Sequence, residues 1–190
     1  MEISCQRYEE IKEVVAQTFR LAGVDKLPIC PFMIAHALEF KQLAYSSLSS
    51  EKQEACLELS AEGFILNETI YYNDLAYDKR ARFTLMHEIG HIMLNHRTES
   101  RMAEKEANFF ARYALAPPIL ILANDQDFEM DKLKIRELFD VSPEVSEYVY
   151  ESYQKWIEQL CGSIPKEPYD VEIYNLIYRS STGQQKTLPD

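Results

Sequence analysis

The sequence has few of the features that define several common protein classes. Its four cysteines lie far apart, at positions 5, 30, 56 and 161, and none belongs to a C-x-x-C pair. This spacing argues against a zinc ribbon or a redox dithiol and indicates reduced, mostly structural thiols. No apolar run approaches the roughly 18 residues needed to cross a bilayer, so we expect no membrane association. There is no internal repeat and no low-complexity block.

Basic residues are also scarce. Lysine and arginine number 20 against 31 aspartates and glutamates, which gives a formal net charge of -11. Such a charge repels a phosphate backbone, so nucleic acid is not expected as a partner.

The opening residues "MEISCQRYEE" lack the basic-then-apolar order of a signal peptide. We therefore expect a cytoplasmic location.

The overall amino-acid composition is that of a globular protein. Of 190 residues, 46% are hydrophobic and 27% are charged. This length accommodates one well-packed domain with a small appended helical unit. We predict a main domain over residues 1–122 and a C-terminal helical appendage and tail over residues 123–190.

Hydrophobic periodicity predicts a mixture of helices and strands, and hence the α+β class. Helices are expected over residues 8–21, with Gly23 as the stop, and over 32–38, 101–115 and 143–160. Alternating residues in "EFKQLAYSSL" and "ACLELSAEGFILNETIYYN" predict a small antiparallel sheet with a turn at Glu62-Gly63. "VEIYNLIY" fits either a strand or a short docking helix, and "RSSTGQQKTLPD" is expected to form a loose polar terminus.

The segment "RFTLMHEIGHIML", residues 82–94, carries the strongest chemical signal. On a helix, with Asp78 as its expected N-cap, His87 and His91 lie on one face and can bind the same metal ion. Glu88 lies at the edge of that face, where it can hold a water molecule and take its proton. A buried pair of histidines without a partner would be costly, which weighs against a purely structural helix.

Two details refine this prediction. Gly90 is unfavourable inside a helix, which suggests that another group approaches the backbone closely there. The helix is also apolar nearly all round, which predicts burial between the sheet and other helices.

A catalytic zinc ion needs a third protein ligand, and the next helix offers two glutamates. In "MAEKEANFFARYALAPP" the residues Ala103, Ala107, Ala111 and Ala114 form a stripe that permits close helix packing. Glu104 borders this stripe and is the favoured third ligand. Glu106 falls nearer the Phe109, Phe110 and Tyr113 side, as a solvated carboxylate or a supporting group. The positions of the two glutamates around the helix do not by themselves decide which one is the ligand.

Other candidates are weaker. His96 is five residues past His91, off the metal face, and is expected to be a surface or C-capping residue. His36 is expected to be a core histidine. Asn108 has either a packing role or a role in orienting a ligand. A tyrosine could stabilise an oxyanion, but packing is the better expectation for each of the four near the motif, Tyr71, Tyr72, Tyr77 and Tyr113.

Together these segments resemble the ImmA/IrrE family of zinc metallopeptidases. The likeness rests on "RFTLMHEIGHIML", on "GFILNE" upstream and on "EKEANFFARYALAPP" downstream. It implies a zincin-like domain whose small sheet packs on the active-site helix, with Zn²⁺ held by His87, His91 and Glu104. It also implies an endopeptidase that cleaves a protein substrate, such as a transcriptional repressor. This chain departs from the family at "YALAPP", where many members have a sequence ending in "LLMP".

Two other functions are compatible with parts of the sequence. One is a zinc-containing anti-repressor that binds its regulator target without cleaving it, although Glu88 would then have no chemical role. The other is a DNA-reading helix-turn-helix in "LKIRELFDVSPEVSEYVYESY". Its second helix carries Glu144, Glu147 and Glu151 with almost no basic residue before Lys155, which favours a packing or substrate-docking element.

Overall fold

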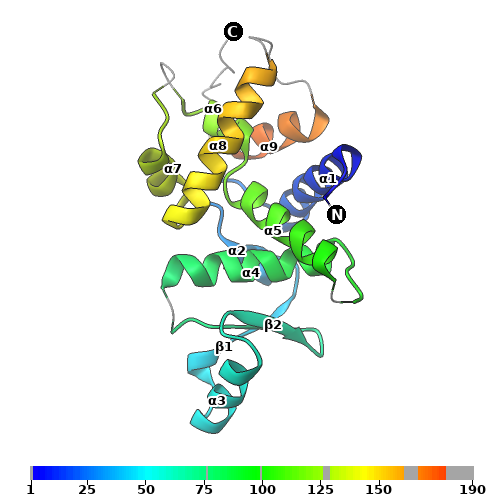
Figure 1. The fold of residues 1–190 in the computed structure, drawn as a ribbon, viewed down its shortest axis with the longest axis vertical. Helices are drawn as coiled ribbons and strands as arrows, with labels where there is room; N and C mark the ends of the chain where they lie inside the picture. The colour runs from blue at the N-terminus through cyan, green and yellow to red at the C-terminus, as the bar shows by residue number, and fades with distance from the viewer. Residues whose placement is uncertain (1, 76, 99, 126–128, 161–166, 179–190) are drawn as a thin grey trace.

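The computed structural model describes residues 2–75, 77–98, 100–125, 129–160 and 167–178. Helix α4, Asp78–Met93, crosses the middle of the molecule, with the sheet and α3 on one side of it and most of the other helices on the other (Figure 1). The protein therefore has the predicted mixed α and β architecture. Helix α4, the motif helix, carries His87, Glu88 and His91 and lies between the sheet and the layer of helices.

The sheet has three strands, β1 (Lys41–Ala44), β2 (Gly63–Leu66) and β3 (Thr69–Tyr72), in the order β1-β3-β2. β2 and β3 form an antiparallel hairpin whose turn residues, Asn67 and Glu68, have φ values of 48° and 59°. β1 runs parallel to β3. The predicted all-antiparallel sheet is therefore wrong, because a helix crosses over after β1.

That helix, α3 (Ser50–Leu59), includes "ACLEL", which we had predicted as strand. A short 3-10 turn, Tyr45–Ser47, precedes it. The predicted turn at Glu62-Gly63 is also wrong, since Gly63 begins β2. A short segment with alternating apolar residues has no strong preference of its own, and here its tertiary neighbours select the helix.

The predicted helices are present with small shifts at their ends. α1 begins after Ser4, whose side chain accepts from the Arg7 amide, and ends at Gly23, which has a φ of 64°. The segment "VEIYNLIY" is helical, and "RSSTGQQKTLPD" lies outside the described residues. The described helices other than α3 and α4 are α1 (Cys5–Ala22), α2 (Pro31–Ala37), α5 (Arg101–Leu115), α6 (Pro118–Leu122), α7 (Lys132–Phe139), α8 (Pro143–Leu160) and α9 (Pro168–Tyr178).

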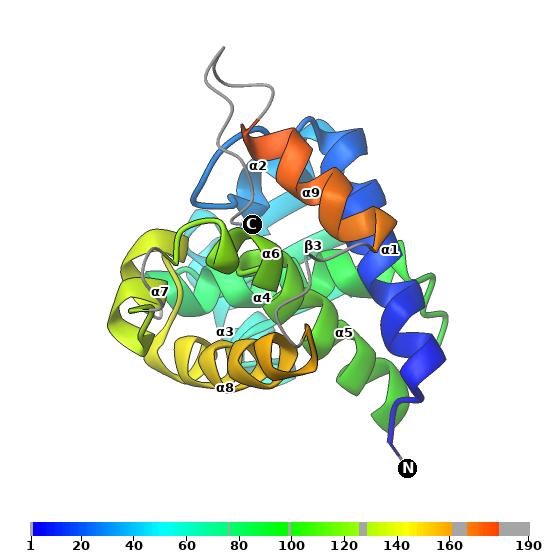
Figure 2. The same cartoon turned by 90° about the horizontal axis from the view of Figure 1, so that it is seen from above.

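The main core lies where α4 meets the helices on its far side from the sheet. Fully buried members include Ile11 of α1, Leu85 and Ile89 of α4, and Phe110 of α5. Figure 2 shows this helical layer from above, with α9 beside α1 and α8 beside α7.

The division into residues 1–122 and 123–190 stays a prediction. Within the described parts of the chain, no helix combines the length and apolarity needed to span a membrane.

Candidate metal centre

Helix α4 presents His87, Glu88 and His91 toward a cleft. Its N-cap is Tyr77 rather than the predicted Asp78, which is the first helical residue. The Asp78 carboxylate reaches only the adjacent Lys79 amide, at 2.8 Å, and not the later amides that an N-cap side chain serves. The acidic group still lies in the first turn, where it interacts favourably with the helix dipole.

Close packing of α5 on α4 brings a carboxylate to the two histidines. The alanine stripe of α5 is buried as predicted, with exposed fractions of 6% for Ala103 and 0% for Ala107, Ala111 and Ala114. Gly90 meets the predicted close neighbour, because a Cβ there would lie 3.0 to 3.2 Å from Phe110 ring and Cβ atoms. Small residues on both helices therefore set the short distance between them.

Glu104, rather than Glu106, lies beside the two histidines. Its carboxylate oxygens are 3.4 Å from His87 Nε2 and 3.3 Å from His91 Nε2. The two Nε2 atoms are 3.0 Å apart. These three residues form a group that can hold one metal ion. The structure thus brings together the trio that the sequence favoured.

These spacings fit a tetrahedral divalent ion. Bonds of about 2.0 to 2.1 Å place tetrahedral ligand atoms about 3.3 to 3.4 Å apart, close to the three distances found here. Two imidazole nitrogens and one carboxylate are three donors, which would leave a fourth position on the ion for water. The residues present therefore fit a divalent metal.

Burial keeps both histidines in the neutral form that binds metal. It lowers the pKa of His87 to about 4. It also lowers the pKa of His91 to about 4, with the nearby His87 adding to the effect. Neutral imidazoles at pH 7 offer lone pairs to a cation without first releasing a proton.

Glu88 lies in the same cleft and is buried, with 8% of its surface exposed. Burial raises its pKa to about 7, and the negative charge of Glu104 contributes to the increase. A carboxylate that titrates near neutrality can both accept and return a proton. This is the property required of a general base.

His96 was predicted to be a surface or C-capping residue off the metal face; the surface position is wrong, whereas its backbone does cap the helix. Its Nδ1 lies 3.0 Å from Nδ1 of His91, and its side chain is 11% exposed. α4 ends at Met93, and Asn95 then adopts a left-handed φ of 56°. The amides of Asn95 and His96 donate to the carbonyls of Ile92 and His91, which is a Schellman motif.

This motif explains the error. A helical wheel extended past residue 93 does not apply once the chain reverses direction. The sequence did carry a signal, since asparagine favours the left-handed position after a helix. With Asn95 assigned to that position, His96 becomes the residue that folds back over His91.

Glu106 is buried and supports His96. Its Oε2 lies 3.1 Å from His96 Nε2 and accepts from Arg7 Nε at 3.0 Å and Nη2 at 2.6 Å. Burial would raise the pKa of Glu106, but the hydrogen bonds from Arg7 and His96 outweigh it and hold this pKa below its ordinary value. Of the two roles predicted for Glu106, the structure shows the supporting one. The contribution of Arg7 was not predicted.

The cleft has a volume of about 540 Å³ and is walled by β2, α4 and α5. Asn108 lines it and donates to the Glu104 carbonyl oxygen at 2.8 Å. None of the four tyrosines considered from the sequence is among its lining residues in the described chain. Tyr113, for example, is buried against Asp170. His36 is exposed on α2, so the prediction of a core histidine is wrong.

The fold and the site together define a metallopeptidase-like domain: a motif helix between a small sheet and a helical layer, with a carboxylate supplied by the next helix. The sequence matches the family model of the IrrE N-terminal-like domain, Peptidase M78, over residues 35–149. The chain therefore belongs to this family, as the resemblance had indicated. Searches of curated proteins and of solved structures returned no significant match.

Proposed function

We propose that this protein is a zinc-dependent endopeptidase with a zincin-like active site. The observation that carries the proposal is the convergence of His87 Nε2, His91 Nε2 and a Glu104 carboxylate within 4.8 Å of one another. These residues would hold the ion, and Glu88 would act beside it. A zinc ion bound there would supply a water of lowered pKa and would polarise a carbonyl group.

The protein residues account for the remaining requirements of amide hydrolysis. Glu88 accepts the proton of the attacking water and then delivers it to the leaving amine nitrogen. His87 and His91 remain neutral throughout because they are buried. The described strand β2 pairs only with β3, so its other edge can bind an extended peptide beside α4.

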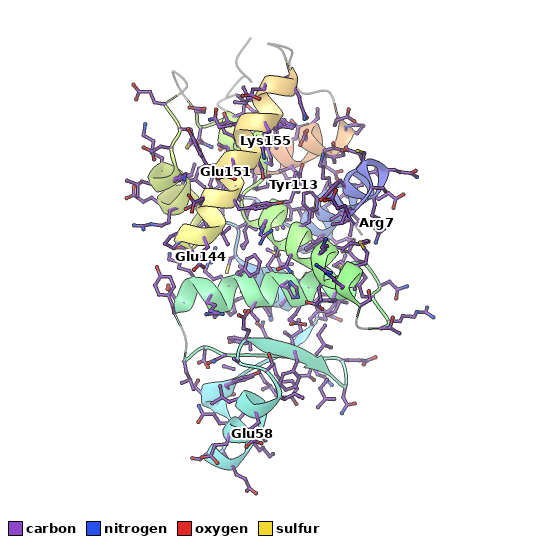
Figure 3. The ribbon with its side chains drawn as sticks, in the orientation of Figure 1. Arg7, Glu58, Tyr113, Glu144, Glu151 and Lys155 are labelled. Atoms are coloured by element: carbon purple, nitrogen blue, oxygen red, sulfur yellow. The ribbon has the colours of Figure 1, made fainter. Side chains whose placement is uncertain are left out.

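We propose a protein substrate, specifically a transcriptional repressor or similar regulator. An extended segment fits a cleft that is open and walled by a strand. Nucleic acid is disfavoured because the exposed face of α8 carries Glu144, Glu147 and Glu151, two of which are labelled in Figure 3. A cytoplasmic location is consistent with such a substrate and remains a proposal.

The Glu88→Gln variant tests the reaction. Glutamine preserves the size of the side chain and leaves the three proposed ligands intact, but it cannot accept the water proton. We expect zinc binding at wild-type stoichiometry and a loss of peptide cleavage of at least 100-fold, in line with general base catalysis. Glu58→Gln, an exposed change on α3, is the matched control.

The same variant separates a peptidase from an anti-repressor that binds without cleaving. A candidate regulator would be incubated with wild-type protein and with Glu88→Gln, and its fragments would be identified by mass spectrometry. Cleavage by wild type alone supports the peptidase. Equal inactivation of the regulator by both proteins, with no fragments, would establish the binding function instead.

A further inference from the structure

One chain of side chains leads away from the proposed metal ligands. It runs from His91 through His96 and Glu106 to Arg7, with contacts of 3.0, 3.1 and 2.6 Å. His96 and Glu106 are nearly enclosed, with side-chain exposures of 11% and 10%. Arg7 belongs to α1, which packs against α5, and it lies outside the residues matched by the family model.

The donors and acceptors in this chain have only one consistent order if the metal site is as proposed. His91 must keep the Nε2 lone pair for the ion, so the proton of its neutral ring is on Nδ1. That N–H points at His96 Nδ1, which must therefore be the acceptor. The proton of a neutral His96 ring is then on Nε2, facing the Glu106 carboxylate, which accepts from Arg7 as well.

His87 has no comparable support at its outer nitrogen. Its Nδ1 is buried and has no hydrogen-bond partner among the described residues. The side chain of Asn108 forms a hydrogen bond with His87, but no chain of polar groups fixes the Nδ1 proton, whereas His91 has one that fixes both its rotation and its tautomer. Outer partners of this kind usually affect metal affinity by roughly 10- to 100-fold.

We propose that His96, Glu106 and Arg7 are positioning residues that hold His91 in its metal-binding tautomer. This inference rests on the proposed metal site. It assigns the N-terminal helix a role in metal binding, because α1 supplies the arginine that orients Glu106. Arg7 also donates to Glu10 at 3.1 Å, which limits its own freedom.

Metal affinity of the full chain provides the test. Zn²⁺ dissociation constants would be measured by chelator competition for wild type, His96→Ala, Glu106→Gln and Arg7→Gln, with unfolding curves of the metal-free proteins recorded alongside. We expect each variant to bind Zn²⁺ roughly 10-fold or more weakly, with the largest effect at His96. His36→Ala and Glu58→Gln change exposed residues of the same types and should bind as wild type does.

Two further measurements distinguish positioning from simple structural support. The visible spectrum of the Co²⁺-loaded protein should change in His96→Ala and should return toward wild type in His96→Asn, whose amide oxygen can accept from His91. The double variant His96→Ala/Glu106→Gln should bind no more weakly than His96→Ala, since the two residues act through one chain. Additive losses would contradict this.

The outcomes separate the two proposals. If wild type binds neither Zn²⁺ nor Co²⁺ at one ion per chain, the metal site itself fails. If wild type binds but His96→Ala and Glu106→Gln are folded and bind within twofold of it, with an unchanged Co²⁺ spectrum, only the positioning role is overturned. If His96→Ala does not fold, Arg7→Gln and Glu106→Gln decide the question by the same criterion.

Discussion

Gly63 lies so close to Thr84 that no side chain fits at residue 63. A Cβ on Gly63 would be 2.6 Å from Thr84 Cγ2 and 2.7 Å from the Tyr71 carbonyl oxygen. Thr84 belongs to α4 and Tyr71 to the neighbouring strand. The absence of a side chain at this position thus lets β2 pass directly against the motif helix, where it forms one wall of the cleft.

We expect Gly63→Ala to destabilise the fold and to displace β2 from α4. Overpacking of this kind costs about 1 to 3 kcal/mol, which urea unfolding would detect. Thr84→Ser removes the methyl group that a Cβ at residue 63 would meet first. The double variant Gly63→Ala/Thr84→Ser should therefore regain part of the lost stability. It should not regain all of it, because the clash with the Tyr71 carbonyl oxygen remains. A Gly63→Ala protein with wild-type stability and activity would show that the strand is free to move.

Glu104→Ala should remove the carboxylate that lies with His87 and His91. We expect the Zn²⁺ dissociation constant to rise by more than the roughly 10- to 100-fold typical of an outer partner. Isothermal titration of the metal-free protein measures this directly. Glu58→Ala is the control for an exposed glutamate, and wild-type affinity in Glu104→Ala would exclude Glu104 as a ligand.

The conformation of Asn95 should control the position of His96. Glycine adopts the left-handed region freely, so Asn95→Gly should keep both stability and metal affinity. Asn95→Val places a β-branched residue at a φ of 56° and should cost about 1 to 2 kcal/mol or more. It should also weaken Zn²⁺ binding, because His96 would lose its place over His91. Equal Zn²⁺ affinity in the two variants would contradict this.

Asp170 should make stability depend on pH. Burial raises its pKa from 3.8 to about 6, although the hydrogen bond from Tyr113 opposes the increase. Because the folded state holds this proton more tightly than the unfolded state, the resulting stability is complete below about pH 3.8 and is lost as pH rises through about 6. The difference corresponds to about 3 kcal/mol.

Asp170→Asn should abolish this contribution. The free energy of unfolding of the metal-free variant, relative to that of wild type, should increase by about 2 kcal/mol between pH 4 and pH 7.5. Urea unfolding at both pH values measures the change, and Glu58→Gln gives the baseline for neutralising an exposed carboxylate. A constant difference between Asp170→Asn and wild type across this range would contradict the assignment.

The sequence alone was sufficient for the parts of the site that depend on one helix. His87, Glu88 and His91 share a face because helical geometry is local and nearly invariant. The alanine stripe on the next helix was also readable, and with it the preference for Glu104. Helix ends at Gly23 and near Pro117 followed from backbone chemistry that does not depend on tertiary contacts.

The contact of His96 with His91 was also within reach of the sequence, because the reversal at Asn95 is a local motif that a helical wheel does not describe. Only the tertiary structure decided what depends on distant partners. The segment before Ser60 became a helix, and β1 joined the sheet in parallel, because packing outweighs the weak preferences of short segments. Arg7 reached Glu106 from 99 positions away. No local pattern records such a contact, since it exists only after α1 and α5 have packed together.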